Sequence, residues 1–407
     1  MEMKLKQTND QYLYRIVIAV TAIATLLPVA CNYIMTGGII YEWIARIEEL
    51  ALELRLFPST DTFLGMWSRE NAMDSNLWFF PAGIIYRISD KLVLTYRIYM
   101  LVIQICTLFF TKLFFERLFA DRKTKLPAFF GILLYMTSPY RIYVCYDLAD
   151  LSGAVVWMVL PLYAWSALGL LLGSRRWRDI VTASLALAGI GYADIVYFFI
   201  LIGVTIFAVF YFKKALPVIT MMAGTILLIP VLYRLFRYLF LDAYLELEIP
   251  VRTIMQNGYC FGQFFSSYAF RENHPGMGLG IFICLLSGLW IWFVVGGEKV
   301  QRRERFFVVL SAILLLLSLR SFPWDYVQRL GVWSLKLVSL INTPAIFAGL
   351  AWNCLCIPAA ASVDRMSGQE NKLIAHAIPL MVLLACIGLC VYQCNMLTCS
   401  RFPMNVL

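Results

Sequence analysis

Three short stretches of this apolar 407-residue chain gather carboxylate and guanidinium groups. In the first, Glu42 and Arg46 lie four residues apart, which puts both side chains on one face of a helix. A carboxylate and a guanidinium group at the mouth of a cavity could act as general base or metal ligand (Glu42) and as anion clamp (Arg46). The alternative interpretation is an interfacial helix whose polar face is wet and carries no chemistry.

The second stretch runs from Arg141 through Tyr146 and Asp147 to Asp150. Two carboxylates, an arginine and tyrosines suit a polar ligand such as a sugar or a phosphate. Asp147 and Asp150 are three residues apart and are predicted to share a helical face. The alternative for this stretch is that Asp150 or Ser152 caps the helix that follows.

The third stretch contains Trp324 and Asp325, directly after Pro323. A tryptophan here suits the aromatic belt of a membrane interface, and Asp325 is the more informative residue. A further acid, Asp194, separates two apolar segments; a membrane-embedded acid suggests function, but the break in the segments favours a turn residue.

The elements that carry these residues must lie in lipid. Hydrophobic residues make up 61% of the chain and charged residues 14%, against about 45–50% and about 25% in soluble domains. The net charge of +9 is scattered over short loops, which argues against nucleic-acid binding. With only two histidines, a His-rich metal site is excluded. We therefore expect an all-α integral membrane protein in which residues 1–407 form a single multi-pass domain.

Apolar runs long enough to cross a bilayer predict about eleven transmembrane helices. They lie near 16–35, 92–119, 126–142, 154–173, 180–194, 195–212, 216–240, 277–297, 305–319, 337–358 and 373–392. Lysine and arginine cluster in the N-terminal segment and in every second loop. The positive-inside rule therefore predicts a cytoplasmic N-terminus.

Two outer loops are long under this topology, at 37–91 and 242–275. Within the first, residues 40–57 alternate polar and apolar positions with helical period, which predicts an amphipathic helix lying on the membrane surface. The apolar segment 76–88 is too short to cross and is interpreted as re-entrant or interfacial. Long loops on one side mark the working face of the molecule.

The order of these features matches a known family. They are the acidic first outer loop, the Arg46-Ile47-Glu48 helix, the Ser138-Pro139-Tyr140-Arg141 turn running to Leu160-Pro161-Leu162, and Phe322-Pro323-Trp324. On these residues the chain resembles the YfhO-like branch of bacterial GT-C-type membrane glycosyltransferases over most of residues 16–360. The resemblance implies a plasma-membrane enzyme that transfers a sugar from a polyprenyl-phosphate donor to an envelope polysaccharide or lipid acceptor, often with a divalent cation.

The chain departs from that family at positions where relatives carry charged or histidine side chains, namely Ile39, Trp43, Leu148, Gly153 and Ile346. Glu42 is one helical turn from Ile39, and it is a candidate replacement for the first-loop acid. Asp147 and Asp150 are candidates for the second pair.

The roles implied by the resemblance follow from these positions. Glu42 would be the catalytic base or metal ligand, and Arg46 and Arg141 would hold the donor phosphates. Tyr146, Asp147 and Asp150 would bind the sugar, while Trp324 and Asp325 would line the acceptor side. The alternatives are a non-catalytic binding scaffold and a transporter or polymerase-type protein for lipid-linked glycans.

Overall fold

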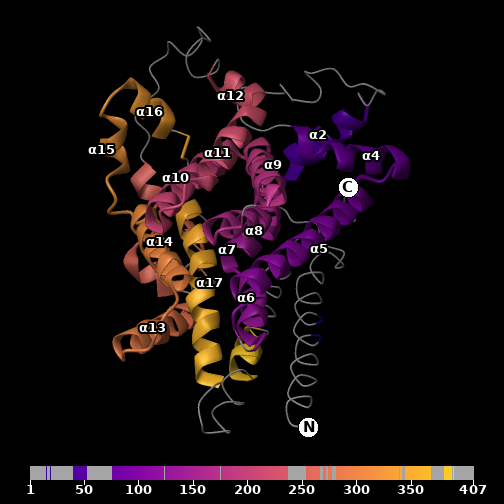
Figure 1. The fold of residues 1–407 in the computed structure, drawn as a ribbon. Helices are drawn as coiled ribbons and strands as arrows, with labels where there is room; N and C mark the ends of the chain where they lie inside the picture. The colour runs from indigo at the N-terminus through magenta and orange to yellow at the C-terminus, as the bar shows by residue number, and fades with distance from the viewer. Residues whose placement is uncertain are drawn as a thin grey trace. The chain divides into compact units, whose positions relative to one another are not determined.

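The computed structural model is largely helical, with one short antiparallel hairpin formed by β1 (Ala269–Arg271) and β2 (His274–Gly276) (Figure 1). It describes residues 15, 19, 40–52, 76–122, 124–174, 176–236, 254–265, 269–271, 274–276, 281–338, 340–341, 344–367, 380–386 and 388. The chain divides into two compact units. Unit 1 comprises Met1–Ala24, Leu118–Ile142 and Glu248–Asn395, and unit 2 comprises Thr25–Arg117, Tyr143–Leu247 and Met396–Leu407. The single domain expected from the sequence stays a prediction.

Unit 2 is built around helix α9. Its elements are α2 (Ile40–Leu52), η1 (Asn76–Trp78), α4 (Phe80–Ser89), α5 (Leu92–Leu118), η2 (Tyr143–Asp147), α8 (Leu151–Leu171), α9 (Trp177–Ala193), α10 (Ile195–Phe212), α11 (Leu216–Leu227) and α12 (Ile229–Phe236). Helix α9 packs against α8, α10 and α11. Gly189 lets the Trp78 ring lie against α9, and the indole N–H donates to the Gly189 carbonyl at 2.8 Å. This contact docks the predicted re-entrant segment onto the helix bundle.

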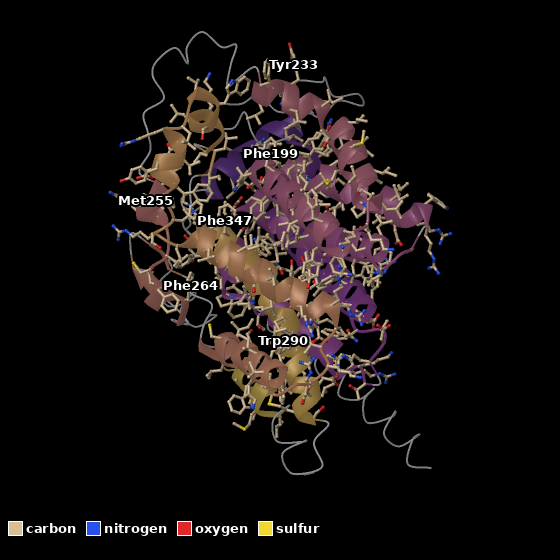
Figure 2. The ribbon with its side chains drawn as sticks, turned by 60° about the vertical axis from the view of Figure 1, so that its left-hand side comes forward. Phe199, Tyr233, Met255, Phe264, Trp290 and Phe347 are labelled. Atoms are coloured by element: carbon tan, nitrogen blue, oxygen red, sulfur yellow. The ribbon has the colours of Figure 1, made fainter. Side chains whose placement is uncertain are left out.

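Unit 1 is built around helix α17. Its elements are α6 (Leu126–Met136), α7 (Pro139–Ile142), η5 (Ile254–Asn257), η6 (Phe261–Phe265), the β1–β2 hairpin, α13 (Ile281–Val295), α14 (Arg302–Ser318), α15 (Trp324–Gln328), α16 (Val332–Val338) and α17 (Ala345–Ser367). Helix α17 packs against α14, α6 and α13 and is largely buried. The Tyr140 ring of α7 occupies the space where a side chain at Gly349 would lie, so glycine is required there. Phe347 of α17 and Trp290 of α13 mark this unit in Figure 2.

Four described helices are long and apolar enough to cross a membrane: α5, α8, α10 and α17. Helices α11 and α12 add a fifth span if the pair, bent by 65°, counts as one. These helices are compatible with a multi-pass membrane protein, although the predicted count of eleven spans is not confirmed. The segments 16–35 and 373–392 lie mostly outside the described residues. The segments 126–142, 180–194, 277–297 and 305–319 correspond to α6, α9, α13 and α14, with 11, 17, 15 and 17 residues.

The amphipathic helix predicted at 40–57 corresponds to α2, although residues 53–57 lie outside the described part. Its apolar face was expected to meet the membrane surface, but in the structure Ile47, Leu50 and Ala51 are buried within the protein. Arg46 was expected on the polar stripe, but it is buried as well. Its guanidinium group lies over the rings of Trp43 and of Phe79, the residue before α4. The prediction that this helix lies on a membrane surface stays untested.

Candidate functional site

Two aspartates stand at the N-terminal ends of membrane-capable helices in unit 2. Asp150 holds the N-cap position of α8 and Asp194 that of α10. Because α9 returns antiparallel to α8, both helix starts lie at the same end of the bundle. The two carboxyl groups are close enough to interact electrostatically. We call them the acid pair.

The Asp194 carboxylate is fixed by the backbone of its own helix. Its Oδ1 accepts hydrogen bonds from the N–H groups of Val196 at 2.7 Å and Tyr197 at 3.4 Å. This is the usual satisfaction of unpaired N–H groups in the first turn of a helix. The predicted break between two helices at this residue is thus confirmed, but the position at the surface is not, and the charge of a second acid, Asp150, acts on its carboxyl group.

Asp150 depends on a glycine for its position. A Cβ at Gly153 would lie 2.6 Å from Asp150 Oδ2 and 2.5 Å from Val144 Cγ1. Gly153 is one of the departures from the family noted in the sequence. A larger residue there would displace the Asp150 carboxylate, so the glycine and the aspartate form one arrangement.

The environment of the acid pair favours the protonated form. Burial raises the pKa of Asp150, an effect partly offset by the N–H groups of Gly153 and Ser152. Burial and the nearby Asp150 charge raise the pKa of Asp194 from 3.8 to about 6, against the two hydrogen bonds from its helix. Carboxyl groups with a pKa near neutrality are suited to accept a proton in general base catalysis.

Polar and aromatic groups extend along α8 and α10 from the acid pair. The buried hydroxyl of Ser152 makes no hydrogen bond with the residues that the structure describes. Further along, the Trp157 and Tyr197 rings meet edge to face at 6.2 Å, and the hydroxyls of Tyr163 and Thr205 are hydrogen-bonded. All of these side chains are buried, so they pack α8 against α10.

The opposite end of the same bundle is basic. Arg176 and Arg178 flank the start of α9, and Lys213 and Lys214 follow α10. There Arg117 forms a two-point ion pair with Asp179, with its Nη1 and Nη2 2.9 and 2.8 Å from the carboxylate oxygens. Burial alone would raise the Asp179 pKa, but the hydrogen bonds and charge of Arg117 hold it below its usual value.

Among the predicted site residues of unit 2, Arg46 and Tyr146 are buried. The Arg46 guanidinium lies 5.3 Å from the Trp43 ring centre and 5.0 Å from that of Phe79, and these two rings are stacked. This geometry is a cation–π arrangement. The side chains of Glu42 and Asp147 lie outside the described part.

The prediction that Asp147 and Asp150 share a helical face is wrong. Asp147 ends η2, whereas Asp150 is an extended residue that precedes α8. Between them Ala149 adopts a positive φ of 52°, so the helical backbone is interrupted between η2 and α8. The acid on which the Asp150 charge acts is instead Asp194.

The remaining predicted site residues belong to unit 1, where their contacts are structural. The buried Arg141 guanidinium donates to the Met136 carbonyl at 2.7 Å. Trp324 stacks on Phe347 at 5.6 Å and its indole N–H donates to the Leu317 carbonyl at 2.9 Å. Asp325 accepts the Met255 N–H at 3.2 Å.

Sequence reasoning missed a buried charge network in unit 1. Glu304, fully buried, accepts hydrogen bonds from Arg122, from Arg365 at 2.8 Å and from the Trp290 indole at 2.9 Å. Asp364 extends the network by pairing with Arg122 at 3.5 Å. The signal in the sequence was a single carboxylate, Glu304, within a basic run that we used only to orient the chain in the membrane.

No group of three or more histidine, cysteine, aspartate or glutamate side chains within the described residues is arranged to hold a metal ion. The acid pair offers two carboxylates, so it would need ligands from elsewhere to complete a cation site.

Comparison with known proteins leaves the family open. No protein-family model matches the chain, and no curated protein matches it. The resemblance to GT-C-type glycosyltransferases therefore stays a prediction from the sequence.

Proposed function

We propose that this chain is a multi-pass membrane glycosyltransferase that uses a polyprenyl-phosphate-linked sugar as donor and an envelope polysaccharide or lipid as acceptor. The observation that carries the proposal is the acid pair, two interacting carboxyl groups at the starts of two membrane-capable helices. The order of motifs in the sequence supports the same function.

The charge distribution supports an extracytoplasmic site. Within the α8–α10 bundle the acid pair lies at one end and Arg176, Arg178 and Lys213 lie at the other. The positive-inside rule then assigns the acid pair to the outer face of the plasma membrane and the N-terminus to the cytoplasm. Lipid-linked sugars presented at the outer face would meet the carboxylates there.

The proposed step is attack of an acceptor hydroxyl on the anomeric carbon of the donor. The new bond joins the acceptor oxygen to that carbon, the bond to the phosphate oxygen breaks, and polyprenyl phosphate leaves. Asp194, with its pKa near 6, takes the hydroxyl proton, and Asp150 orients the sugar hydroxyls. Glu42 is the competing candidate for the base, as predicted from the sequence.

Single replacements separate these assignments. The assay follows radiolabel from polyprenyl-phosphate-linked glucose, mannose or N-acetylglucosamine into the lipid and polysaccharide fractions of membranes that contain the full chain. Loss of a general base is expected to lower transfer about 100-fold or more. Asp194→Asn and Glu42→Gln are compared with the exposed control Asp90→Asn in the same unit.

If Asp194→Asn abolishes transfer and Asp90→Asn does not, the acid pair is the catalytic site. If only Glu42→Gln abolishes it, the base lies in the first outer loop. Full transfer in both variants, or no transfer from any donor by the unmodified chain, would refute the proposed enzyme.

A further inference from the structure

The segment between α14 and α17 exposes large apolar and aromatic side chains. Tyr326, Leu330, Val332 and Trp333 are between 62% and 80% exposed, although all are large and apolar or aromatic. They belong to α15, α16 and the turn between them, which are drawn in orange in Figure 1. We call these four residues the α15–α16 surface.

The exposure is not a consequence of loose attachment. The inner side of the segment is tied to unit 1 through buried Trp324, which stacks on Phe347, and through Asp325, which accepts the Met255 N–H at 3.2 Å. The Ser334 hydroxyl donates to the Val327 carbonyl and joins α16 to α15. The α15–α16 surface is therefore held facing outward.

The charge of this segment is positive. Between residues 320 and 338 the chain has Arg320, Arg329 and Lys336 but one acid, Asp325, which leaves three positive charges against one negative. Arg329 lies 5.9 Å from the centre of the Tyr326 ring, so a cation and an aromatic ring share the exposed side. Aromatic and basic side chains together are typical of the headgroup region of a bilayer.

The size of the segment sets how it can meet a membrane. Helices α15 and α16 have five and seven residues, far short of a span. Helix α17, which follows, is apolar and long enough to cross. A short, fixed, basic and aromatic segment next to a spanning helix fits the plane of the interface.

We propose that the α15–α16 surface lies in the membrane interface and binds anionic lipid headgroups. Tyr326, Leu330, Val332 and Trp333 enter the boundary between headgroups and acyl chains, and Arg329 contacts the lipid phosphate. This inference uses the membrane association of the chain but not sugar transfer.

Photo-crosslinking in nanodiscs tests the proposal. The full chain carries benzoylphenylalanine in place of Leu330, in nanodiscs of equal phosphatidylglycerol and phosphatidylcholine. Adducts are identified by mass spectrometry. Each basic residue near an anionic surface favours it by about fivefold, so we expect a phosphatidylglycerol preference of at least about fivefold. The matched control carries the same label at Leu285, an exposed leucine of α13, a helix that has no basic residue.

The expected result is lipid adducts at position 330 with a preference for phosphatidylglycerol, which falls about fivefold in Arg329→Gln. Adducts at position 285 are expected to show no such preference. Protein–protein adducts at 330, equal labelling of both lipids, or a preference unchanged in Arg329→Gln would each overturn the proposal. Because no sugar donor is present, these results do not depend on the proposed enzyme.

Discussion

Replacement of Glu304 tests how unit 1 is held together. Its fully buried carboxylate serves Arg122, Arg365 and the Trp290 indole. Glu304→Gln keeps the shape of the side chain but removes its negative charge. One of its two acceptor oxygens becomes an NH2 group, a donor that then lies next to a guanidinium group. Removing one partner of a buried ion pair costs about 3–5 kcal/mol. Arg122 is 20% exposed and also pairs with Asp364, so we expect a smaller cost of about 2–3 kcal/mol.

The assay is thermal unfolding in detergent, followed by tryptophan fluorescence. For a unit of this size about 1 kcal/mol corresponds to about 2–4 °C, so Glu304→Gln is expected to lower the Tm by about 4–12 °C.

A matched control uses the same guanidinium group. Glu298 also pairs with Arg365, at 3.3 Å, but its side chain is 47% exposed. Because exposed ion pairs contribute about 0–1 kcal/mol, Glu298→Gln is expected to change the Tm by less than about 4 °C. Equal shifts in the two variants, or an unchanged Tm in Glu304→Gln, would refute the reasoning that burial makes this network stabilising.

Two further predictions concern unit 2. Gly169→Ala places a methyl group where the Arg117 guanidinium lies, so we expect it to lower the free energy of unfolding by about 1–3 kcal/mol. The methyl group of Gly203→Ala meets nothing within 4 Å, so we expect this change to stabilise α10 by about 0.5–1 kcal/mol. Thermal unfolding compares the two variants, and equal stabilities would contradict the prediction. Because the pKa of Asp194 is raised to about 6, its contribution to the stability of the fold is fully present below pH 3.8 and is lost as the pH rises through about 6. Asp150→Asn removes the like charge beside it, so in unfolding measured as a function of pH we expect this loss to occur at lower pH. A loss at the same pH in the variant would disprove the electrostatic coupling.

Apolar periodicity predicted the spanning helices of unit 2 well, but it misplaced helix ends that carry paired charges. The predicted segments 92–119 and 195–212 correspond closely to α5 and α10. The segment 337–358 was displaced by about two to two and a half turns at both ends, since α17 runs from Ala345 to Ser367. The difference arises because Asp364 and Arg365 suggest a loop, whereas in the structure they pair with Arg122 and Glu304 and the helix continues.

Proline marked a second feature that length and hydropathy alone could not predict. The apolar run 216–240 was expected to form one span, but it bends by 65° between α11 and α12. Pro230 is the second residue of α12, where its missing N–H cannot continue the hydrogen-bond ladder of α11. The predicted division at Asp194 was correct for a related reason, because its carboxylate caps the new helix.

The site was harder to predict than the fold because it depends on contacts across the sequence. Spacing along the chain suggested Asp147 as the neighbour of Asp150, yet the charge of Asp150 acts on Asp194, which is 44 residues away in the numbering. Arg46 was placed on a wet face by its helical angle alone. Trp43 lies on the same helix, but the Phe79 ring that also covers Arg46 comes from another element, which a helical wheel cannot show.

The two ends of helix α9 show how structural and functional acids differ in this fold. Asp179 and Asp194 flank the same helix, yet their pKa values move in opposite directions. Asp179 is paired with Arg117, so its charge is neutralised and it ties α9 to α5. Asp194 forms no ion pair with the described residues, and the charge of Asp150 acts on it. Two like charges close to each other lower the stability of the folded protein when both are ionised. Such a cost is retained where the acids exchange protons or bind a ligand, which makes the acid pair a stronger candidate site than the paired carboxylates among the described residues.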